Sequence, residues 1–166
     1  SDIFLAVGNN PMVSSYSPLG GLQGTDPFTK MREAKKRGMK LIVIDPRETE
    51  LASSADIHLQ PIPGEDPTLL AGLLNVIFEK SVYDHNFCDE WVEPSTLDSL
   101  INSISRFTPE YVAKRCDVDQ GAIIEAALMF ANGEKGGAGT GTGPSMAPHS
   151  SLTEHLIICL NVICGR

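Results

Sequence analysis

The stretch IFLAVGNNP, residues 3–11, decides the fold class of this 166-residue chain. Five apolar residues in a row are typical of a strand buried on both faces, and the run stops at Gly8. Asn9-Asn10-Pro11 then predicts a turn, and three more glycines follow within residues 20–24. A strand that ends in a glycine turn is typical of phosphate-binding domains, but the G-x-G-x-x-G spacing is missing. The residues alone leave open whether this turn meets a phosphate or only connects two elements.

Strands and helices alternate along the rest of the chain. Further strands are predicted at residues 41–44, 56–60 and 134–140, and long helices at about 27–37, 68–81, 118–132 and 150–164. Shorter helical pieces are expected between residues 83 and 115, and Asp117 is predicted to cap the helix after them. This alternation predicts an α/β fold: a Rossmann-like three-layer domain with a mostly parallel sheet and helices on both faces. We expect residues 1–166 to form a single domain cut from a larger subunit, because residue 3 already lies inside a strand.

The composition is acidic, with 42% hydrophobic and 20% charged residues and a net charge of −8. A broadly acidic surface argues against a nucleic-acid partner, because phosphate contacts need a basic stripe. The one dense basic cluster, within residues 30–40, is expected to be the solvated face and C-terminal end of a helix. No apolar run is long enough to span a membrane, so direct membrane insertion is not expected. Nothing in the sequence indicates the compartment.

The cysteines and histidines predict neither a disulfide framework nor a metal site. The cysteines form no C-x-x-C pair and are expected to be thiols of the core: Cys88, Cys116, Cys159 and Cys164. The four histidines lack the spacing of metal ligands. We therefore expect no metal ligand within this segment.

Four loops leave the carboxyl ends of the predicted strands, where parallel sheets bind their ligands: residues 8–24, 45–47, 61–66 and 139–143. Gly8 permits close backbone approach to a diphosphate, and Asn10 and Ser14 add side-chain donors. Asp45 stands where an acidic residue accepts ribose hydroxyls in dinucleotide folds. Asp66 is expected either to accept hydrogen bonds from a purine amino group or merely to cap its helix.

Each of these residues also has a purely structural interpretation. An aspartate such as Asp45 after a strand is often a turn residue, and Asn9-Asn10-Pro11 alone is a turn signal. The spacing disfavours ordinary NAD binding, because Asp45 follows Gly8 by 37 residues, whereas a nicotinamide-binding unit has roughly 20.

Longer blocks of the sequence resemble the molybdopterin oxidoreductase family, which contains formate dehydrogenases, nitrate reductases and dimethyl sulfoxide reductases. The blocks are VGNNP (residues 7–11), the run from RGMKLIVIDPR to YDHNF (residues 37–87) and RFTPEYVA (residues 106–113). The family pattern reads G-x-N-P, I-D-P-R followed by A-D, P-G-x-D before an apolar helix, Y-D-x-x-F, T-P-E-x-V and a G-x-G loop. Every block occurs here in that order, and the match runs nearly from Asp2 to Arg166.

The resemblance implies one of the two Rossmann-like domains that hold bis(molybdopterin guanine dinucleotide), with molybdenum or tungsten bound in the parent protein. It implies four groups of cofactor-binding residues: Gly8, Asn10, Pro11 and Ser14 at the diphosphate; Asp45, Pro46 and Arg47 at the guanosine; Gly64 and Asp66 at the guanine edge; Gly141 and Gly143 nearer the pterin. After the last loop the chain departs from the family, since residues 144–149 replace a pattern with Gln and His. In the family, the metal ligand and any iron–sulfur cysteines lie upstream of this segment.

The resemblance also implies that the parent is an enzyme of two-electron redox or oxygen-atom chemistry and that this segment alone is inactive. The implied partners are the remaining domains of the same large subunit, and the family allows an iron–sulfur electron-transfer subunit. Two alternatives stay open: the central FAD- or ADP-binding domain of a thiamine diphosphate enzyme, and a non-catalytic nucleotide-sensing module. Pro46-Arg47 and the block at residues 63–66 argue against the first, and the abrupt strand start argues against the second.

Overall fold

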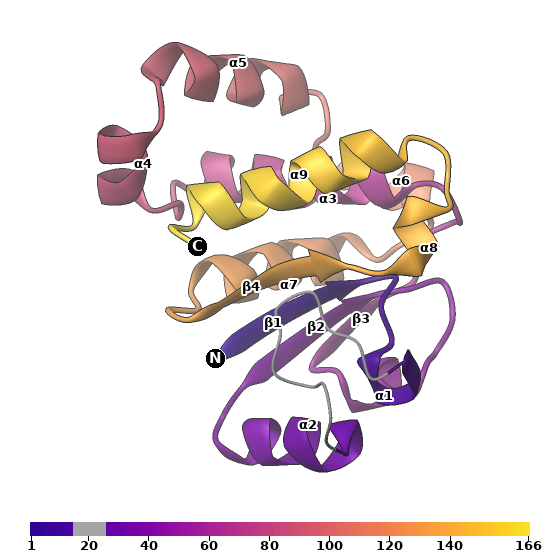
Figure 1. Ribbon diagram of the computed structural model, residues 1–166. Coiled ribbons are helices and arrows are strands. Elements are labelled where there is room, and N and C mark those ends of the chain that lie inside the picture. The colour runs from indigo at the N-terminus through magenta and orange to yellow at the C-terminus, as the bar shows by residue number, and fades with distance from the viewer. Residues whose placement is uncertain (15–25) are drawn as a thin grey trace.

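A four-stranded parallel sheet organises the computed structural model, which describes residues 1–14 and 26–166. The strands are β1 (Ile3–Val7), β2 (Lys40–Ile44), β3 (Ile57–Leu59) and β4 (Gly136–Thr140). Their order is β3-β2-β1-β4, and every pairing among them is parallel (Figure 1). Helices lie on both faces of the sheet, so the predicted Rossmann-like α/β architecture is confirmed. The glycines of residues 20–24 lie outside the described residues.

The sheet separates two hydrophobic clusters, because successive side chains of a strand point to opposite faces. Along β1, Ile3, Leu5 and Val7 belong to one cluster, whereas Phe4 and Ala6 belong to the other. The larger cluster is covered by α3 (Asp66–Glu79), α7 (Gln120–Ala131) and α9 (Ser150–Ile163). The smaller cluster is covered by α2 (Pro27–Lys36) and the short helix α1, which both lie below the sheet in Figure 1. Burial on both faces explains why β1 is apolar throughout.

Three further helices follow α3 and precede α7 in the sequence: α4 (His85–Trp91), α5 (Pro94–Ile104) and α6 (Pro109–Cys116). The other helical pieces are the single turns α1 (Pro11–Ser14), the 3₁₀ turn η1 (Ala52–Ser54) and α8 (Thr142–Ser145). The prediction that Asp117 caps the following helix is wrong. Asp117 instead ends α6 in the left-handed conformation, with φ of 57°, which aspartate tolerates better than most residues. Asp119 caps α7, because its carboxylate accepts a hydrogen bond from the amide of Ala122 at 2.8 Å.

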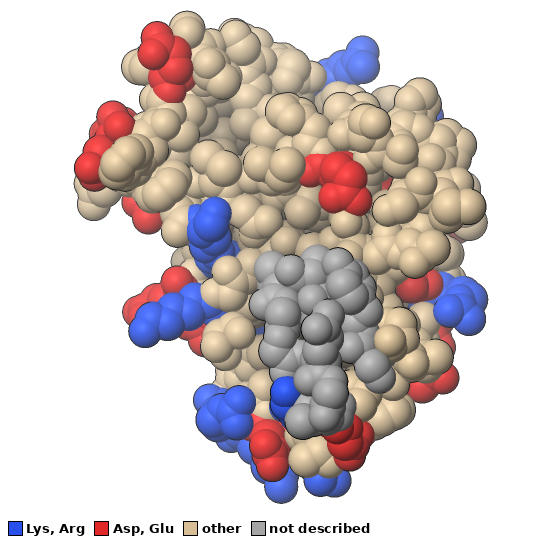
Figure 2. Space-filling view, in the orientation of Figure 1, with Lys and Arg blue, Asp and Glu red and all other residues tan. Residues whose placement is uncertain are grey.

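Two lysines of the basic cluster form ion pairs within the fold. Lys35 on α2 and Lys40 on β2 both pair with Asp56, at 2.8 and 3.2 Å. These contacts hold α2 and β2 to the start of β3. In Figure 2, blue and red side chains are interspersed at the lower end of the molecule, where α2 lies. None of the helices formed by the described residues has the length and apolar character needed to cross a membrane.

Candidate functional site

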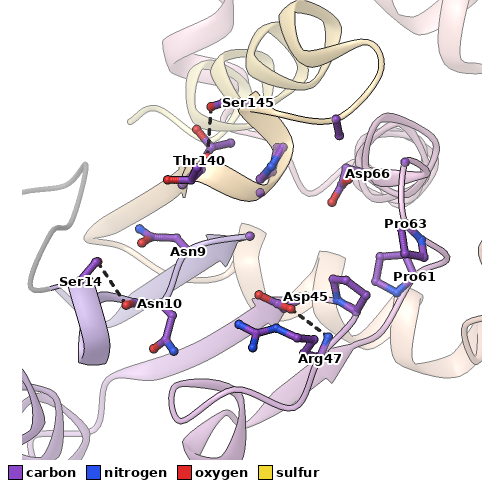
Figure 3. Close-up of a pocket in the computed structure, with 18 of the residues that line it drawn as sticks. Asn9, Asn10, Ser14, Asp45, Arg47, Pro61, Pro63, Asp66, Thr140 and Ser145 are labelled. Atoms are coloured by element: carbon purple, nitrogen blue, oxygen red, sulfur yellow. Dashed lines mark hydrogen bonds between the residues drawn. The ribbon is translucent and has the colours of Figure 1, made fainter.

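The loops at the carboxyl ends of the strands enclose a cavity of about 1170 Å³, which is ample for a nucleotide. All of the predicted site residues except Pro11 line it: Gly8, Asn10, Ser14, Asp45, Pro46, Arg47, Gly64, Asp66, Gly141 and Gly143. Pro11 is buried as the first residue of α1. Figure 3 shows side chains from the ends of β1, β2 and β4 and from the start of α3 around one open space. Residues far apart in the sequence are therefore brought together at this edge of the sheet.

The strand order divides the cavity into two halves. Asp45 follows β2 and Asp66 begins α3 shortly after β3, so the two carboxylates lie over the β2–β3 side. The loop after Gly8 and the loop of residues 141–145 follow β1 and β4, so glycines and hydroxyls lie over the other side. The cavity thus offers acidic acceptors at one end and a backbone with little side-chain bulk at the other.

Asp45 is fixed in a tight turn at the end of β2. The side chain is 8% exposed, and its carboxylate accepts a hydrogen bond from the amide of Arg47 at 2.8 Å. His58 Nε2 lies 2.9 Å from the backbone carbonyl oxygen of Asp45 and donates to it. The turn interpretation of Asp45 is therefore correct, and the same turn holds the carboxylate on the cavity wall.

Asp66 is the first residue of α3, not its N-cap. The N-cap position belongs to Glu65, which makes no side-chain capping bond, so the interpretation of Asp66 as a mere cap is wrong. Burial raises the pKa of the Asp66 carboxyl, and the nearby charge of Asp45 raises it further. Two neighbouring buried carboxylates are stabilised by a ligand that donates hydrogen bonds to both. Asp66 thus places a buried carboxyl group in the cavity wall.

Gly8 joins the two glycine loops. It has φ of +54°, and a Cβ at this position would lie 2.2 Å from Cδ of Pro144. Its amide donates to the carbonyl of Ile44 at 2.8 Å, and its carbonyl accepts from the amide of Gly143 at 3.3 Å. Gly8 is thus needed for the packing of the site, and its own amide is already engaged in the sheet.

The two side chains that were expected to add donors each make a hydrogen bond within the protein. Asn10 Nδ2 donates to Glu50 Oε2 at 2.7 Å, and the atom left unpaired is the acceptor Oδ1. Ser14 Oγ donates to the carbonyl of Asn10 at 3.2 Å (Figure 3). Glu50 takes one of the two N–H groups of Asn10, so at most one is left for a phosphate.

Three further residues of the lining were missed by sequence reasoning: Asn9, Glu50 and Glu154. Asn9 was interpreted only as part of a turn, yet it is 4% exposed, so it is buried in the wall. Glu154 lies on α9 and accepts a hydrogen bond from Thr140 Oγ1 at 2.5 Å. No local pattern marks these residues, because their positions depend on where α9 and the residue 45–50 turn meet the sheet.

The loop of residues 61–66 is fixed to the end of α6. Arg115 Nε and Nη2 donate to the two carboxylate oxygens of Glu65 at 2.8 and 2.9 Å, and Thr68 Oγ1 donates to the same carboxylate at 2.6 Å. The guanidinium beside Glu65 is the main reason that the pKa of this carboxyl is lowered. Because Glu65 directly precedes Asp66, the Arg115 contact determines where Asp66 stands.

Replacing Arg115 by Met is expected to loosen this loop while leaving the sheet intact. Amide hydrogen exchange at Glu65 is expected to become about 10-fold faster, because local opening no longer breaks a two-point contact. Arg115→Lys is the control, and it restores only part of the protection, since an ammonium group cannot match both oxygens. Unchanged exchange at Glu65 in the Met variant would show that the backbone alone holds the loop.

The thiols are poor nucleophiles in this fold. Cys88 and Cys116 are buried, and Cys159 and Cys164 are half-buried. Burial raises the pKa of Cys116 to about 12 and that of Cys164 to about 11. In the part of the chain that the structure describes, no three His, Cys, Asp or Glu side chains gather to hold a metal ion.

Comparison with known proteins identifies relatives of this chain, although no family model matches it. F420-dependent formate dehydrogenase subunit alpha of Methanocaldococcus jannaschii is 40% identical over 106 residues, which cover 64% of this chain and 16% of that protein. Acetylene hydratase of Syntrophotalea acetylenica is 38% identical over 104 residues, covering 63% of the chain and 14% of the relative. Formate dehydrogenase H of Escherichia coli is 33% identical over 133 residues, covering 80% and 18%.

The fold has a solved counterpart as well. The structure of acetylene hydratase from Pelobacter acetylenicus superposes with a TM-score of 0.84 and 30% identity, over 99% of this chain and 21% of that one. The chain thus spans about a fifth or less of the relatives it matches. The similarity in sequence and the similarity in fold agree with the resemblance carried by the sequence blocks, and this chain belongs to the molybdopterin oxidoreductase family.

Proposed function

We propose that residues 1–166 form one domain of a larger subunit and hold the guanosine diphosphate part of a molybdopterin guanine dinucleotide. The observation that carries the proposal is the division of the cavity into a carboxylate half and a glycine half. Guanine presents N1–H and N2–H₂ as adjacent donors, and ionised carboxylates only accept. Adenine lacks this donor pair. Asp45 and Asp66 therefore suit a guanine nucleoside better than an adenine one.

The opposite half suits the diphosphate. Gly141 and Gly143 carry no side chain, so a ligand can approach the backbone closely there. Arg47 lines the cavity and supplies positive charge next to the acidic half. The two alternative functions lack a comparable observation: an FAD- or ADP-binding domain would place an adenine against the carboxylates, and a free sensing module would leave the similarity to much longer relatives unexplained.

The relatives differ in the reactions that their names state, which supports a binding role for this segment. Formate dehydrogenases and acetylene hydratase carry similar stretches, and holding a cofactor is a task that enzymes with different substrates can share. In the parent, a molybdenum or tungsten centre on bis(molybdopterin guanine dinucleotide) would supply two-electron redox or oxygen-atom chemistry. Asp45, Asp66 and the glycine loops would bind and orient the nucleotide end. The other domains of the subunit, and an iron–sulfur subunit as electron partner, would complete the enzyme.

Thermal unfolding of the 166-residue chain with different nucleotides tests the proposal. GDP at ten times its Kd is expected to raise the Tm by about 4 °C, because ligand bound only to the folded chain stabilises it. ADP, FAD and NAD at the same concentration are expected to give smaller shifts. A larger shift with ADP or FAD would contradict the guanine assignment and favour the thiamine diphosphate alternative.

A further inference from the structure

Asn9 carries a buried hydrogen-bond donor that the described part of the chain leaves unpaired. The residue is 4% exposed, and its Nδ2 has no partner. The neighbouring Asn10 differs, since its Nδ2 donates to Glu50. A buried donor without an acceptor lowers the stability of the folded chain. Such a group in a cavity wall indicates a partner that arrives with a ligand.

The position of Asn9 is fixed by its neighbours on both sides. It follows Gly8 at the end of β1, and a Cβ at Gly141 would lie 2.8 Å from both Cα and Cβ of Asn9. The glycine at 141 therefore makes room for Asn9 between β1 and β4. In Figure 3, Asn9 lies on the opposite side of the open space from Asp66.

The chemistry of the glycine-lined half of the cavity indicates what kind of group can pair with Asn9 Nδ2. Two carboxylates of the cavity lining already accept hydrogen bonds from other side chains: Glu50 from Asn10, and Glu154 from Thr140. An amide nitrogen can only donate, so its missing partner is an acceptor. The glycine-lined half is also the half in which the proposed function places the diphosphate, which has only acceptor oxygens to offer.

We infer that Asn9 is a ligand-binding residue whose Nδ2 donates a hydrogen bond to a phosphate oxygen of the bound nucleotide. The identity of the nucleotide rests on the proposed function, whereas the unpaired donor is a property of this chain. Folding positions the donor in advance, and the ligand supplies its partner. Stability of the unliganded chain and affinity for phosphate therefore oppose one another at Asn9.

Asn9→Leu separates these two effects, because it replaces the amide by an apolar group of similar size. Without ligand, the Tm is expected to rise by about 3 °C as the unpaired donor disappears. Calorimetric titration is expected to show about 10-fold weaker binding of GDP and of pyrophosphate, since one hydrogen bond to a charged oxygen is lost. Binding of guanosine, which has no phosphate, is expected to stay unchanged. Asn9→Asp turns an acceptor toward the phosphate and is expected to weaken GDP binding more than Asn9→Leu does.

Asn75→Leu is the matched control. Asn75 on α3 is 5% exposed and also has an unpaired amide atom, Oδ1, but it does not line the cavity. Its Nδ2 donates to the carbonyl of Ile104 at 3.4 Å. The control is expected to change the Tm while leaving the affinities for GDP and pyrophosphate as in the wild type.

The outcomes separate this inference from the proposed function. Unchanged GDP and pyrophosphate binding in Asn9→Leu, with GDP still preferred to ADP, would overturn the role of Asn9 alone. An equal loss for guanosine would also overturn it, because the contact would then lie on the nucleoside. A wild-type chain that binds ADP better than GDP, with both weakened by Asn9→Leu, would uphold Asn9 and overturn the guanine assignment. A wild-type chain that binds neither GDP nor pyrophosphate would overturn both.

Discussion

Gly8→Ala is expected to lower the Tm by about 10 °C, which corresponds to about 3 kcal/mol of folding stability in a chain of this size. The added Cβ would lie 2.2 Å from Cδ and 2.9 Å from Cγ of Pro144, much closer than van der Waals contact. Pro144 is buried, and its ring cannot swing aside as a flexible side chain could. The left-handed conformation of residue 8 adds about 1 kcal/mol for any residue with a Cβ. Thermal unfolding followed by circular dichroism measures the loss.

Two variants separate the contact from the backbone strain. Gly38 also has a positive φ, of +95°, but a Cβ there would meet nothing within 4 Å. Gly38→Ala therefore isolates the conformational cost and is expected to lose about 1 kcal/mol. Combining Gly8→Ala with Pro144→Ala removes the ring atoms and is expected to cost less than the sum of the two single changes. Strictly additive losses would mean that the ring contact is not the cause.

The sheet could be predicted from the sequence because burial on both faces leaves a direct signature. Every residue of β1 is buried, so the sequence of this strand is apolar throughout. Helix ends were less certain where two capping residues compete. Aspartate is common at the N-cap of a helix, so Asp117 and Asp119 were both candidates for the cap of α7. The choice between them depends on where α6 ends. That end is set by tertiary packing, which no local pattern records.

The location of the site could also be predicted, since it follows from topology. The carboxyl ends of parallel strands meet at one edge, and the loops that follow them must meet there too. The pairings inside the site could not be predicted. Asn10 bonds to Glu50 and Arg115 bonds to Glu65, and each pair joins segments at least 40 residues apart. Such contacts decide which atoms remain for a ligand: Glu50 takes one N–H group of Asn10, and the unpaired donor of Asn9 was overlooked.

Asp66→Asn is expected to weaken GDP binding about 100-fold and to strengthen binding of xanthosine diphosphate. In the proposed complex the carboxylate of Asp66 would accept from two adjacent guanine donors, and each hydrogen bond to a charged group contributes about 1.5 kcal/mol or more. Asparagine can accept only one of them, and its amide donor faces the guanine amino group. Xanthine carries a carbonyl oxygen at that place, which accepts from the asparagine amide. Calorimetric titration of both nucleotides against both chains measures the change of preference.

The pH dependence of stability tests the same carboxyl without any ligand. Burial and the charge of Asp45 raise the pKa of Asp66 above its usual 3.8 in the folded chain. The stability that Asp66 contributes is therefore fully present below pH 3.8 and is lost as the pH rises through its raised folded value. Asp66→Asn removes this loss, so its Tm relative to wild type is expected to increase across that window. Asp117→Asn, at an exposed aspartate outside the cavity lining, controls for the removal of one charge. A pH-independent difference together with an unchanged nucleotide preference would exclude Asp66 as the residue that recognises guanine.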